Sequence, residues 1–305
     1  LPVDDGAYTM PVRYPGTAEV VTSLQESSPQ EVDLAVAAAR RSIERRAWAN
    51  CSVTERQATL RRIGALVVEH REELAFLECL AAGLPLHHLR DRQVPRAAEN
   101  FGFFADTIGQ LAGETFEQMP GYLTIVTREA VGVAALVSPW NAPLALASMQ
   151  IASCIAFGNS CVLKPSEQTP LALLRLMALL QEAGVPDGVV NLVNGRGDVT
   201  GEALCGHADV DRIAFTGGNV TARRIMAAAA RNLTPVHFEL GGKSANIVFD
   251  DCDVERAVDG ALLGSFGNSG QICIAGSRIL LQRGIAEQFI GAFVARTRAL
   301  RVGDP

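Results

Sequence analysis

Residues 131–164 read VGVAALVSPWNAPLALASMQIASCIAFGNSCVLK, and no charged residue lies between Glu129 and Lys164. The stretch exceeds the roughly 20 apolar residues that a membrane-spanning helix needs. Prolines, asparagines and a glycine interrupt it, however, so a single spanning helix does not fit the pattern. The stretch instead predicts a strand, a loop, a buried helix and a second strand, with the strands at 131–137 and 160–163 and the helix at about 143–156.

The same alternation of strand and helix continues toward the C-terminus. Further strands are expected at 189–193, 211–215 and 236–240, and further helices at about 170–183, 198–206 and 219–231. Alternation of this kind favours a parallel, doubly wound α/β sheet, which binds ligands outside the carboxyl ends of its strands. Short motifs rich in polar residues or glycine follow three of these strands. The motifs are Ser138-Pro139-Trp140-Asn141, Lys164-Pro165-Ser166-Glu167 and Phe215-Thr216-Gly217-Gly218.

The chain before residue 131 has a different character. Residues 1–28 are rich in turn residues and poor in strand signals, so we expect an arm laid over a larger body. Ser28-Pro29-Gln30-Glu31 has the capping pattern of a helix start, and two more long helices are expected at 53–80 and 86–111. Residues 113–130 predict a β-hairpin that turns at Pro120-Gly121 and presents an edge for a partner.

The composition narrows the class of protein. The net charge is −6, which offers no basic surface for nucleic acid. Hydrophobic residues at 48% and charged residues at 20% are typical of a globular protein with a sizeable core, and 305 residues could form two domains. Seven cysteines, an odd number, favour reduced thiols in a cytoplasmic setting. The five histidines are scattered, so no metal site is expected, and no secretory signal is evident.

Two residues suited to covalent chemistry lie beside glycines in the last quarter of the chain. Glu239 closes the expected strand just before Gly241-Gly242, and Cys273 follows Gly267 and Gly270. Glycines allow close backbone approach to a ligand, so a thiol among them can face a cleft. A cysteine thiolate can add to a carbonyl carbon, and a carboxylate can activate the water that hydrolyses the product. A lone cysteine is more often a small buried hydrophobe, as we expect for the other six, and a strand-end glutamate is usually solvated.

Polar groups at the other strand ends suggest a nucleotide. Lys164 and Glu167 flank Pro165, where a cation and a carboxylate could hydrogen-bond ribose hydroxyls, although a surface ion pair between near neighbours is the alternative. Gly217-Gly218 before a helix supplies backbone N–H groups for an anion, although it is not the usual G-x-G-x-x-G fingerprint.

Asn141 is the candidate for stabilising a charged intermediate. A side-chain amide beside the nucleophile could donate to the oxyanion that forms when a thiolate adds to an aldehyde. A loop asparagine more commonly bonds its own backbone, so this role depends on where the loop lies.

Glu239-Leu240-Gly241-Gly242-Lys243, followed by Gly270-Gln271-Ile272-Cys273, resembles the two signature patterns of the aldehyde dehydrogenase superfamily, in the same order. The resemblance covers essentially the whole chain and implies an aldehyde dehydrogenase-like, Rossmann-like fold. It implies NAD-dependent oxidation of an aldehyde, with Cys273 as nucleophile, Glu239 as general base and Asn141 as oxyanion donor. The segments Val236–Glu239 and Ile247–Asp250 faintly resemble semialdehyde dehydrogenases of aromatic catabolism.

The resemblance also implies a set of cofactor contacts. Glu167 would repel a 2′-phosphate, so NAD is favoured over NADP. The family's glycine five residues after Gly217 is Ala222 here, and Gly218 stands where a hydroxyl residue is common. The expected cofactor-binding residues are Ser138, Pro139, Trp140, Lys164, Ser166, Glu167, Gly197, Gly201, Phe215, Thr216, Gly217, Gly218 and Leu240.

The domain organisation expected from the resemblance has three parts. Residues 1–112 and 131–241 form an NAD-binding domain, residues 113–130 an oligomerisation hairpin, and residues 242–305 the beginning of a catalytic domain. Family members continue past Pro305, so the chain is expected to be a fragment or a truncated product, and a homo-oligomer when full length. Two alternatives stay open, which are a non-catalytic nucleotide-binding protein and a cofactor-independent cysteine hydrolase or thioesterase.

Overall fold

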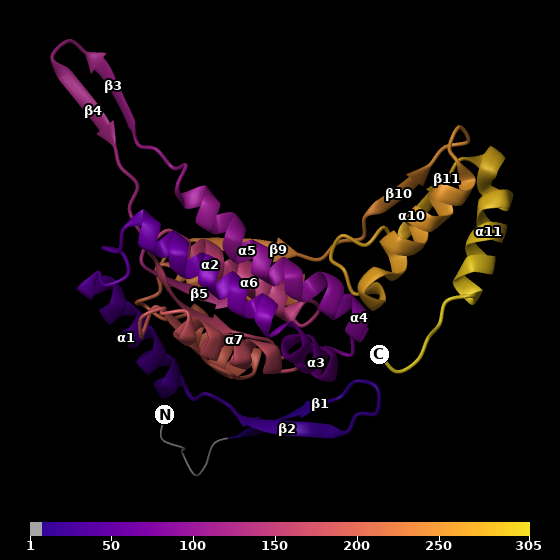
Figure 1. Ribbon diagram of the computed structural model, residues 1–305, viewed down its shortest axis with the longest axis horizontal. Helices are drawn as coiled ribbons and strands as arrows, with labels where there is room; N and C mark the ends of the chain where they lie inside the picture. The colour runs from indigo at the N-terminus through magenta and orange to yellow at the C-terminus, as the bar shows by residue number, and fades with distance from the viewer. Residues whose placement is uncertain (1–7) are drawn as a thin grey trace.

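A parallel five-stranded sheet forms the centre of the computed structural model, which describes residues 8–305 (Figure 1). Its strand order is β7-β6-β5-β8-β9, so the chain builds outward from β5 on one side and then returns to the other. That order is doubly wound, and it confirms the predicted fold class and the predicted strands. The strands are β5 (Val133–Val137), β6 (Ser160–Lys164), β7 (Val190–Leu192), β8 (Arg212–Gly217) and β9 (Val236–Leu240).

Helices cover both faces of this sheet because its side chains alternate between two cores. Ala134 and Leu136 of β5 face one core, whereas Val133, Ala135 and Val137 face the other. The first core is covered by α2 (Val53–Glu69), α3 (Arg71–Ala82), α5 (Val94–Ile108), α6 (Pro143–Ala156) and α7 (Leu171–Glu182). The second is covered by α1 (Pro29–Arg45), α8 (Glu202–Cys205) and α9 (Asn219–Ala230).

The predicted helix at 53–80 is wrong in one respect, because it is two helices. His70 ends α2 and begins α3 with φ −92° and ψ 23°. Arg175 of α7 donates to Glu73 and lies 3.2 Å from the His70 ring, so a contact made across the fold accompanies the break. The predicted helix at 86–111 comprises α4 (Leu86–His88), a π-turn (Leu89–Gln93) and α5, and it ends at Ile108. The capping box predicted at Ser28 and Glu31 is present at the start of α1.

The N-terminal arm was predicted to be poor in strands, and this is wrong for the residues that the structure describes. β1 (Thr9–Arg13) and β2 (Val20–Gln25) pair as an antiparallel hairpin. Met10 and Val12 are buried, and the buried Glu26 carboxylate receives hydrogen bonds from the backbone and guanidinium of Arg196. The arm is therefore held by residues about 170 positions away in the sequence. Residues 1–7 of the predicted arm lie outside the described part.

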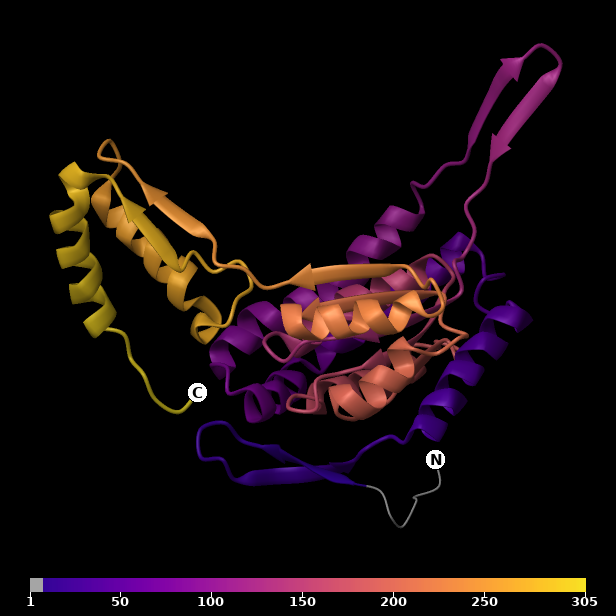
Figure 2. The ribbon, with the colours of Figure 1, turned by 180° about the vertical axis from the view of Figure 1, so that it is seen from behind.

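The second hairpin projects far from the body, as Figures 1 and 2 show. It consists of β3 (Glu114–Met119) and β4 (Tyr122–Val126), with the turn at Pro120-Gly121 that the sequence predicts. Gly121 has φ +85°, which explains the glycine at this position. Tyr122, Leu123 and Ile125 are exposed on it.

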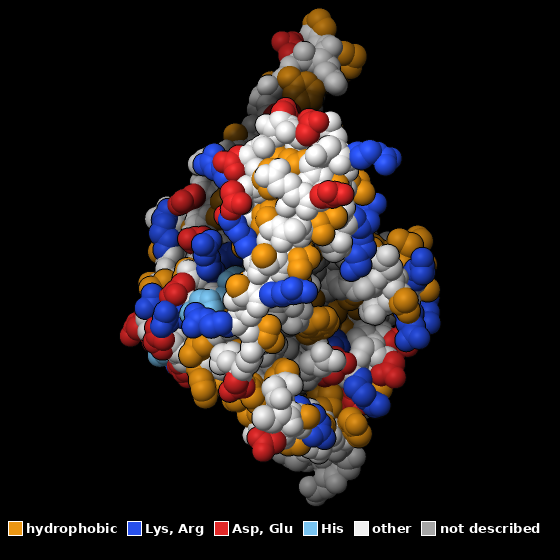
Figure 3. Space-filling model, turned by 90° about the vertical axis from the view of Figure 1, so that its right-hand side faces the viewer, with side chains coloured by type: hydrophobic (Ala, Val, Ile, Leu, Met, Phe, Trp, Pro, Cys, Tyr) orange, Lys and Arg blue, Asp and Glu red, His pale blue; other side chains and the backbone are white. Residues whose placement is uncertain are grey.

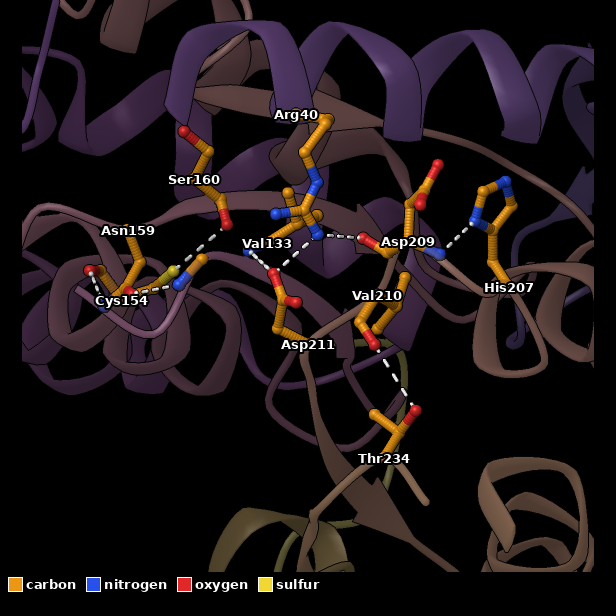
Figure 4. A network of polar contacts seen from close by, with 11 residues as sticks. Arg40, Val133, Cys154, Asn159, Ser160, His207, Asp209, Val210, Asp211 and Thr234 are labelled. Atoms are coloured by element: carbon orange, nitrogen blue, oxygen red, sulfur yellow. Dashed lines mark hydrogen bonds and ion pairs between the residues drawn. The ribbon is translucent and has the colours of Figure 1, made fainter. Parts of the chain in front are cut away.

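A polar network ties together the amino-terminal ends of the strands, opposite the predicted site (Figure 4). The Asp211 carboxylate accepts hydrogen bonds from the Val133 N–H at 2.7 Å and from Arg40 at 2.6 Å. A Cβ at Gly132 would lie 2.0 Å from an Asp211 oxygen, and Gly132 has φ +131°. Only glycine fits there, and the network therefore fixes where β5 begins relative to β8 and α1.

After β9 the chain leaves the large sheet and forms a small separate unit (Figures 1 and 2). It contains β10 (Ala245–Val248), α10 (Val254–Phe266), β11 (Arg278–Leu281) and α11 (Ala286–Arg298), and its two strands pair in parallel. Its core is small, around Val258, Ala261 and Phe289. Figure 3 views the molecule from this end and shows hydrophobic side chains among charged ones on its surface. Ile247, Phe249 and Ile274 of the small unit are exposed. Within residues 8–305 no helix is long and apolar enough to cross a membrane.

One buried carboxyl leads to a prediction about stability. Glu78 of α3 is 1% exposed, and neither of its oxygens has a hydrogen-bond partner among the described residues. Burial raises the pKa of Glu78 to about 8. The pKa of Glu78 is thus higher in the folded protein than in the unfolded chain. The folded state is favoured most at pH below about 4.5, where the carboxyl is protonated in both states. This contribution to stability is lost as the pH rises to about 8, because the buried carboxyl must then ionise.

We therefore expect Glu78→Gln to stabilise the protein at alkaline pH, by up to about 5 kcal/mol, and to flatten the dependence of stability on pH. Denaturant midpoints measured at about pH 5 and about pH 9 would show this. Glu72→Gln, an exposed change on the same helix, serves as the control and should leave the pH dependence as it is. Equal pH profiles for wild type and Glu78→Gln would contradict the assignment.

Candidate active site

The predicted motifs meet at the carboxyl-terminal edge of the large sheet. Val137 pairs in register with Lys164 on one side and Phe215 on the other, and Thr216 pairs with Glu239. The residues that end β5, β6, β8 and β9 therefore lie along one edge, although the sequence separates them by up to about a hundred positions. This is the edge at which a doubly wound sheet binds its ligand.

Cys273 lies in the loop that connects α10 to β11. It is exposed, whereas Cys79, Cys154, Cys161 and Cys205 are buried and Cys51 and Cys252 are half-buried. All seven lie in the described part of the chain and none forms a disulfide. The Gly242 N–H donates to the Cys273 carbonyl at 3.1 Å, which holds the cysteine loop against the turn that follows β9. The cysteine that the sequence singled out is thus the one with an accessible thiol.

Asn141 follows β5 and lies against the cysteine loop. Its Nδ2 donates to the Gln271 carbonyl at 2.8 Å, two residues before Cys273. One amide hydrogen is therefore engaged with the loop, and the second is left over because a primary amide has two. The structure brings Asn141 and the cysteine loop together from separate sheets.

Glu239 is exposed at the end of β9 and faces an open cleft. The alternation of β9 places His237 and Glu239 on one side, and His237 Nε2 lies 3.0 Å from Glu239 Oε1. Met149 and Thr216 line the same cleft, whose volume is about 1360 Å³. Phe238 turns to the other side and packs edge-to-face on Phe215. His237 is not among the site residues predicted from the sequence. Its position two residues before Glu239 on the same strand could have predicted that both side chains lie on one face.

Lys164 is nearly enclosed, and it forms with Glu167 the near-neighbour ion pair that was the alternative to a ribose site. Its side chain is 3% exposed, its Nζ donates to the Pro165 carbonyl at 2.9 Å, and Glu167 Oε2 lies 3.6 Å away. Burial lowers the pKa of Lys164, and the neighbouring Glu167 opposes that effect. Glu167 is 40% exposed, so its carboxylate keeps access to the solvent side of the site.

A cavity of about 350 Å³ lies beside this ion pair. It is lined by the end of β5 at Val137, by Gly197 and Gly201 of a π-turn, and by one face of α9. A Cβ at Gly201 would contact the Lys164 stem at 3.5 Å, so the glycine lets the chain approach the lysine closely. Sequence reasoning missed Thr221 and Arg224, which also line the cavity. Their spacing of three on the helix after Gly217-Gly218 was an available signal.

The start of α9 is the predicted anion-binding element. Its N-cap residue is Gly218, which has no side chain that could accept a hydrogen bond. Among the described residues, no side chain caps the first N–H groups of this 12-residue helix. A Cβ at Gly217 would lie 2.4 Å from the Phe215 ring, which explains that glycine. Ala222 stands where the family has a glycine, and it is buried on the inner face of α9. Its methyl group therefore fills space in the core. The cavity, the enclosed lysine and this helix start suit a dinucleotide.

The remaining predicted contacts lie around the same edge. The Ser138 hydroxyl is buried without a hydrogen-bond partner among the described residues, and Pro139 is buried beside it. Trp140 and Leu240 are exposed. The Ser166 Oγ accepts a hydrogen bond from the Gln168 N–H. Among the described residues, no group of three or more histidine, cysteine, aspartate or glutamate side chains could hold a metal ion.

The fold and site define an α/β protein with polar and glycine-rich motifs at the carboxyl-terminal edge of its parallel sheet and an exposed cysteine in a loop bonded to that edge. The model of the aldehyde dehydrogenase family matches residues 3–305, and the chain belongs to that family. This confirms the family resemblance.

Relatives of known name include semialdehyde dehydrogenases. The chain is 42% identical to the 5-carboxymethyl-2-hydroxymuconate semialdehyde dehydrogenase of Escherichia coli, over 95% of the chain and 61% of that protein. It is 40% identical to the betaine aldehyde dehydrogenase of Brucella ovis, over 99% of the chain and 61% of that protein. The chain thus spans about three fifths of the length of the curated relatives it matches.

Solved structures agree with these relatives. PnpE in complex with nicotinamide adenine dinucleotide is 43% identical and superposes with a TM-score of 0.95, over 98% of this chain and 61% of that one. PnpE comes from Pseudomonas sp. WBC-3. An NAD⁺ complex of an aldehyde dehydrogenase from Bacillus cereus is 39% identical, with a TM-score of 0.95 and coverage of 97% and 60%.

Proposed function

We propose that the protein oxidises an aldehyde to a carboxylic acid with NAD as the oxidant. The observation that carries the proposal is the exposed Cys273 in a loop bonded both to Asn141 and to Gly242, at the ligand-binding edge of the sheet. The names of the relatives support the reaction class, and two solved relatives are NAD complexes.

In the proposed mechanism the Cys273 thiolate adds to the aldehyde carbon and forms a thiohemiacetal. The oxyanion is stabilised by the second N–H of the Asn141 amide and by the Cys273 backbone N–H, which do not need to reorganise during the reaction. NAD, when bound, would supply the hydride acceptor, and loss of the hydride from the thiohemiacetal carbon would leave a thioester on Cys273. Glu239 then takes a proton from a water molecule that attacks the thioester carbon, and the acid leaves with the thiol restored.

The residues at the cofactor end would bind the two parts of NAD differently. Lys164 and Glu167 would hydrogen-bond the hydroxyls of a ribose, and the cavity between Gly201 and Arg224 would take the adenosine end. The uncapped start of α9 at Gly217-Gly218 would face the pyrophosphate. The other residues that the sequence predicts as cofactor contacts are also proposed to contact NAD.

The projecting hairpin supports a proposal about assembly. Its exposed apolar side chains stand on two strands whose outer edges are free within the described chain. We propose that it pairs with another subunit of a homo-oligomer, as the family resemblance implies.

The test is a steady-state assay of the protein at its natural length, with NAD⁺ or NADP⁺ and a panel of semialdehydes and betaine aldehyde. We expect equal amounts of acid and reduced cofactor, and a preference for NAD⁺ of about tenfold or more in kcat/KM, because the Glu167 carboxylate repels a 2′-phosphate. Glu167→Gln should shrink the preference, whereas Glu182→Gln, an exposed change at the end of α7, should not.

Each contrary result has a distinct meaning. Acid formed from a thioester without any cofactor would indicate a hydrolase. Nucleotide binding with no turnover of any aldehyde would indicate a non-catalytic protein. A preference for NADP⁺ would remove Glu167 from the role proposed for it.

A further inference from the structure

Asn268 occupies a strained and buried position just before the reactive cysteine. It is 7% exposed, and its backbone has φ 53° and ψ 39°. Ser269 and Gly270 follow with φ of 55° and 73°, so three consecutive residues are left-handed. Non-glycine residues adopt this conformation at a cost and keep it only where surrounding contacts hold them. For Asn268 these contacts are hydrogen bonds of its own side chain.

The Asn268 amide and the Asn141 amide interlock. Asn268 Nδ2 donates to the Asn141 carbonyl at 2.8 Å and to the Gln271 carbonyl at 3.3 Å. Asn141 Nδ2 in turn donates to the same Gln271 carbonyl at 2.8 Å. Asn268 Oδ1 accepts a 3.4 Å hydrogen bond from Gln93 of the π-turn before α5. Each asparagine therefore holds the backbone of the segment that contains the other.

These bonds are the side-chain link between the two units of the molecule at the site, and the hydrogen bond from the Gly242 N–H to the Cys273 carbonyl adds a backbone link from the turn after β9. Asn141 follows a strand of the large sheet, whereas Cys273 belongs to the unit built on β10 and β11. Among the described residues, every hydrogen bond between residues 8–241 and the cysteine loop, residues 267–276, involves Asn141 or Asn268. No strand pairing joins the two sheets. The distance between the nucleophile and its oxyanion donor thus depends in part on these two side chains, because the Gly242 bond holds the Cys273 backbone but does not contact Asn141.

We propose that Asn268 is a positioning residue, which holds the Asn141 amide and Cys273 in the relative placement that the oxyanion requires. The proposal rests on the proposed function, because it concerns that reaction. A misplacement of about 1 Å at a reacting centre can lower the rate about a hundredfold. Loss of the Asn268 amide should therefore act on kcat, because no residue of this loop lines the cavity proposed for the dinucleotide.

The main variant is Asn268→Gly, because glycine accepts the left-handed backbone and removes only the side chain. We expect kcat to fall by about 10- to 100-fold, with the KM for NAD⁺ changed less than about twofold. Ser269→Gly is the matched control, since Ser269 has the same conformation, is exposed, and makes no side-chain hydrogen bond in the described structure. It should keep wild-type kcat within about twofold.

A double-mutant cycle separates positioning from a general loss of structure. If Asn268 acts through Asn141, the change Asn268→Gly should have little further effect once Asn141 has become alanine. Fully additive losses, or equal effects of Asn268→Gly and Ser269→Gly, would overturn the proposal. Should Asn268→Gly fail to fold, Asn268→Asp keeps the size and backbone preference but turns the donor into an acceptor opposite the Asn141 carbonyl, and it should lower kcat at least as much.

Hydrogen exchange gives a readout that does not depend on activity. We expect the amides of residues 267–276 to exchange faster in Asn268→Gly than in wild type, and unchanged in Ser269→Gly. Unchanged exchange in Asn268→Gly would overturn the positioning role. A wild-type protein that oxidises no aldehyde would instead refute the proposed function, while the exchange experiment still tests the interlock.

Discussion

Cys273→Ala is expected to abolish aldehyde oxidation, with a loss in kcat of about 10⁴-fold or more, because no other group can form the covalent intermediate. Cys273 is the exposed cysteine of the seven, and its carbonyl accepts a hydrogen bond from the Gly242 N–H, which holds the backbone beside the exposed thiol. The variant should still bind NAD⁺ with wild-type affinity, since the cavity proposed for the dinucleotide is built from β5, the π-turn and α9.

Turnover measured by the absorbance of NADH, together with calorimetric titration of NAD⁺, would test both parts of this expectation. Cys252→Ala is the control, because Cys252 is half-buried in the same unit and should tolerate the change with near-normal activity. More than about one per cent of wild-type turnover in Cys273→Ala would exclude this residue as the nucleophile.

Glu239→Gln is expected to separate the two halves of the reaction. The amide keeps the size of the side chain and its contact with His237, but it cannot accept the proton of the attacking water. Thioester formation should therefore proceed, and one equivalent of NADH should appear in a rapid burst. The steady state should then be slower by about 10²- to 10⁴-fold, which is the range that general bases contribute.

Rapid mixing with a good aldehyde substrate, followed by mass spectrometry of the Cys273 peptide, would detect the burst and the trapped acyl group. Glu287→Gln, an exposed change on α11, should behave as wild type. If burst and steady state disappear together while the fold is intact, Glu239 acts before hydride transfer or only structurally.

The large sheet could be predicted because its pattern is local. Apolar strands such as 131–137 are bounded by glycine and proline, and the helices between them repeat at a helical period, so each element is specified by its own residues. The two hairpins show the limit of such reasoning. The Pro120-Gly121 turn is a local signal that predicts its hairpin, whereas the β1–β2 hairpin is followed by Glu26, whose carboxylate bonds the distant Arg196.

The sequence by itself determined the family, the doubly wound sheet, and the identity of the chemically reactive candidates Cys273, Glu239 and Asn141. Each of these residues lies in a short motif of consecutive residues, so the sequence is enough to identify it. Only the tertiary structure decided that Lys164 is enclosed, that Glu78 is buried without a partner, and that Asn268 joins the two units. Burial and hydrogen bonds between distant segments decide these features, and both exist only once the chain has folded.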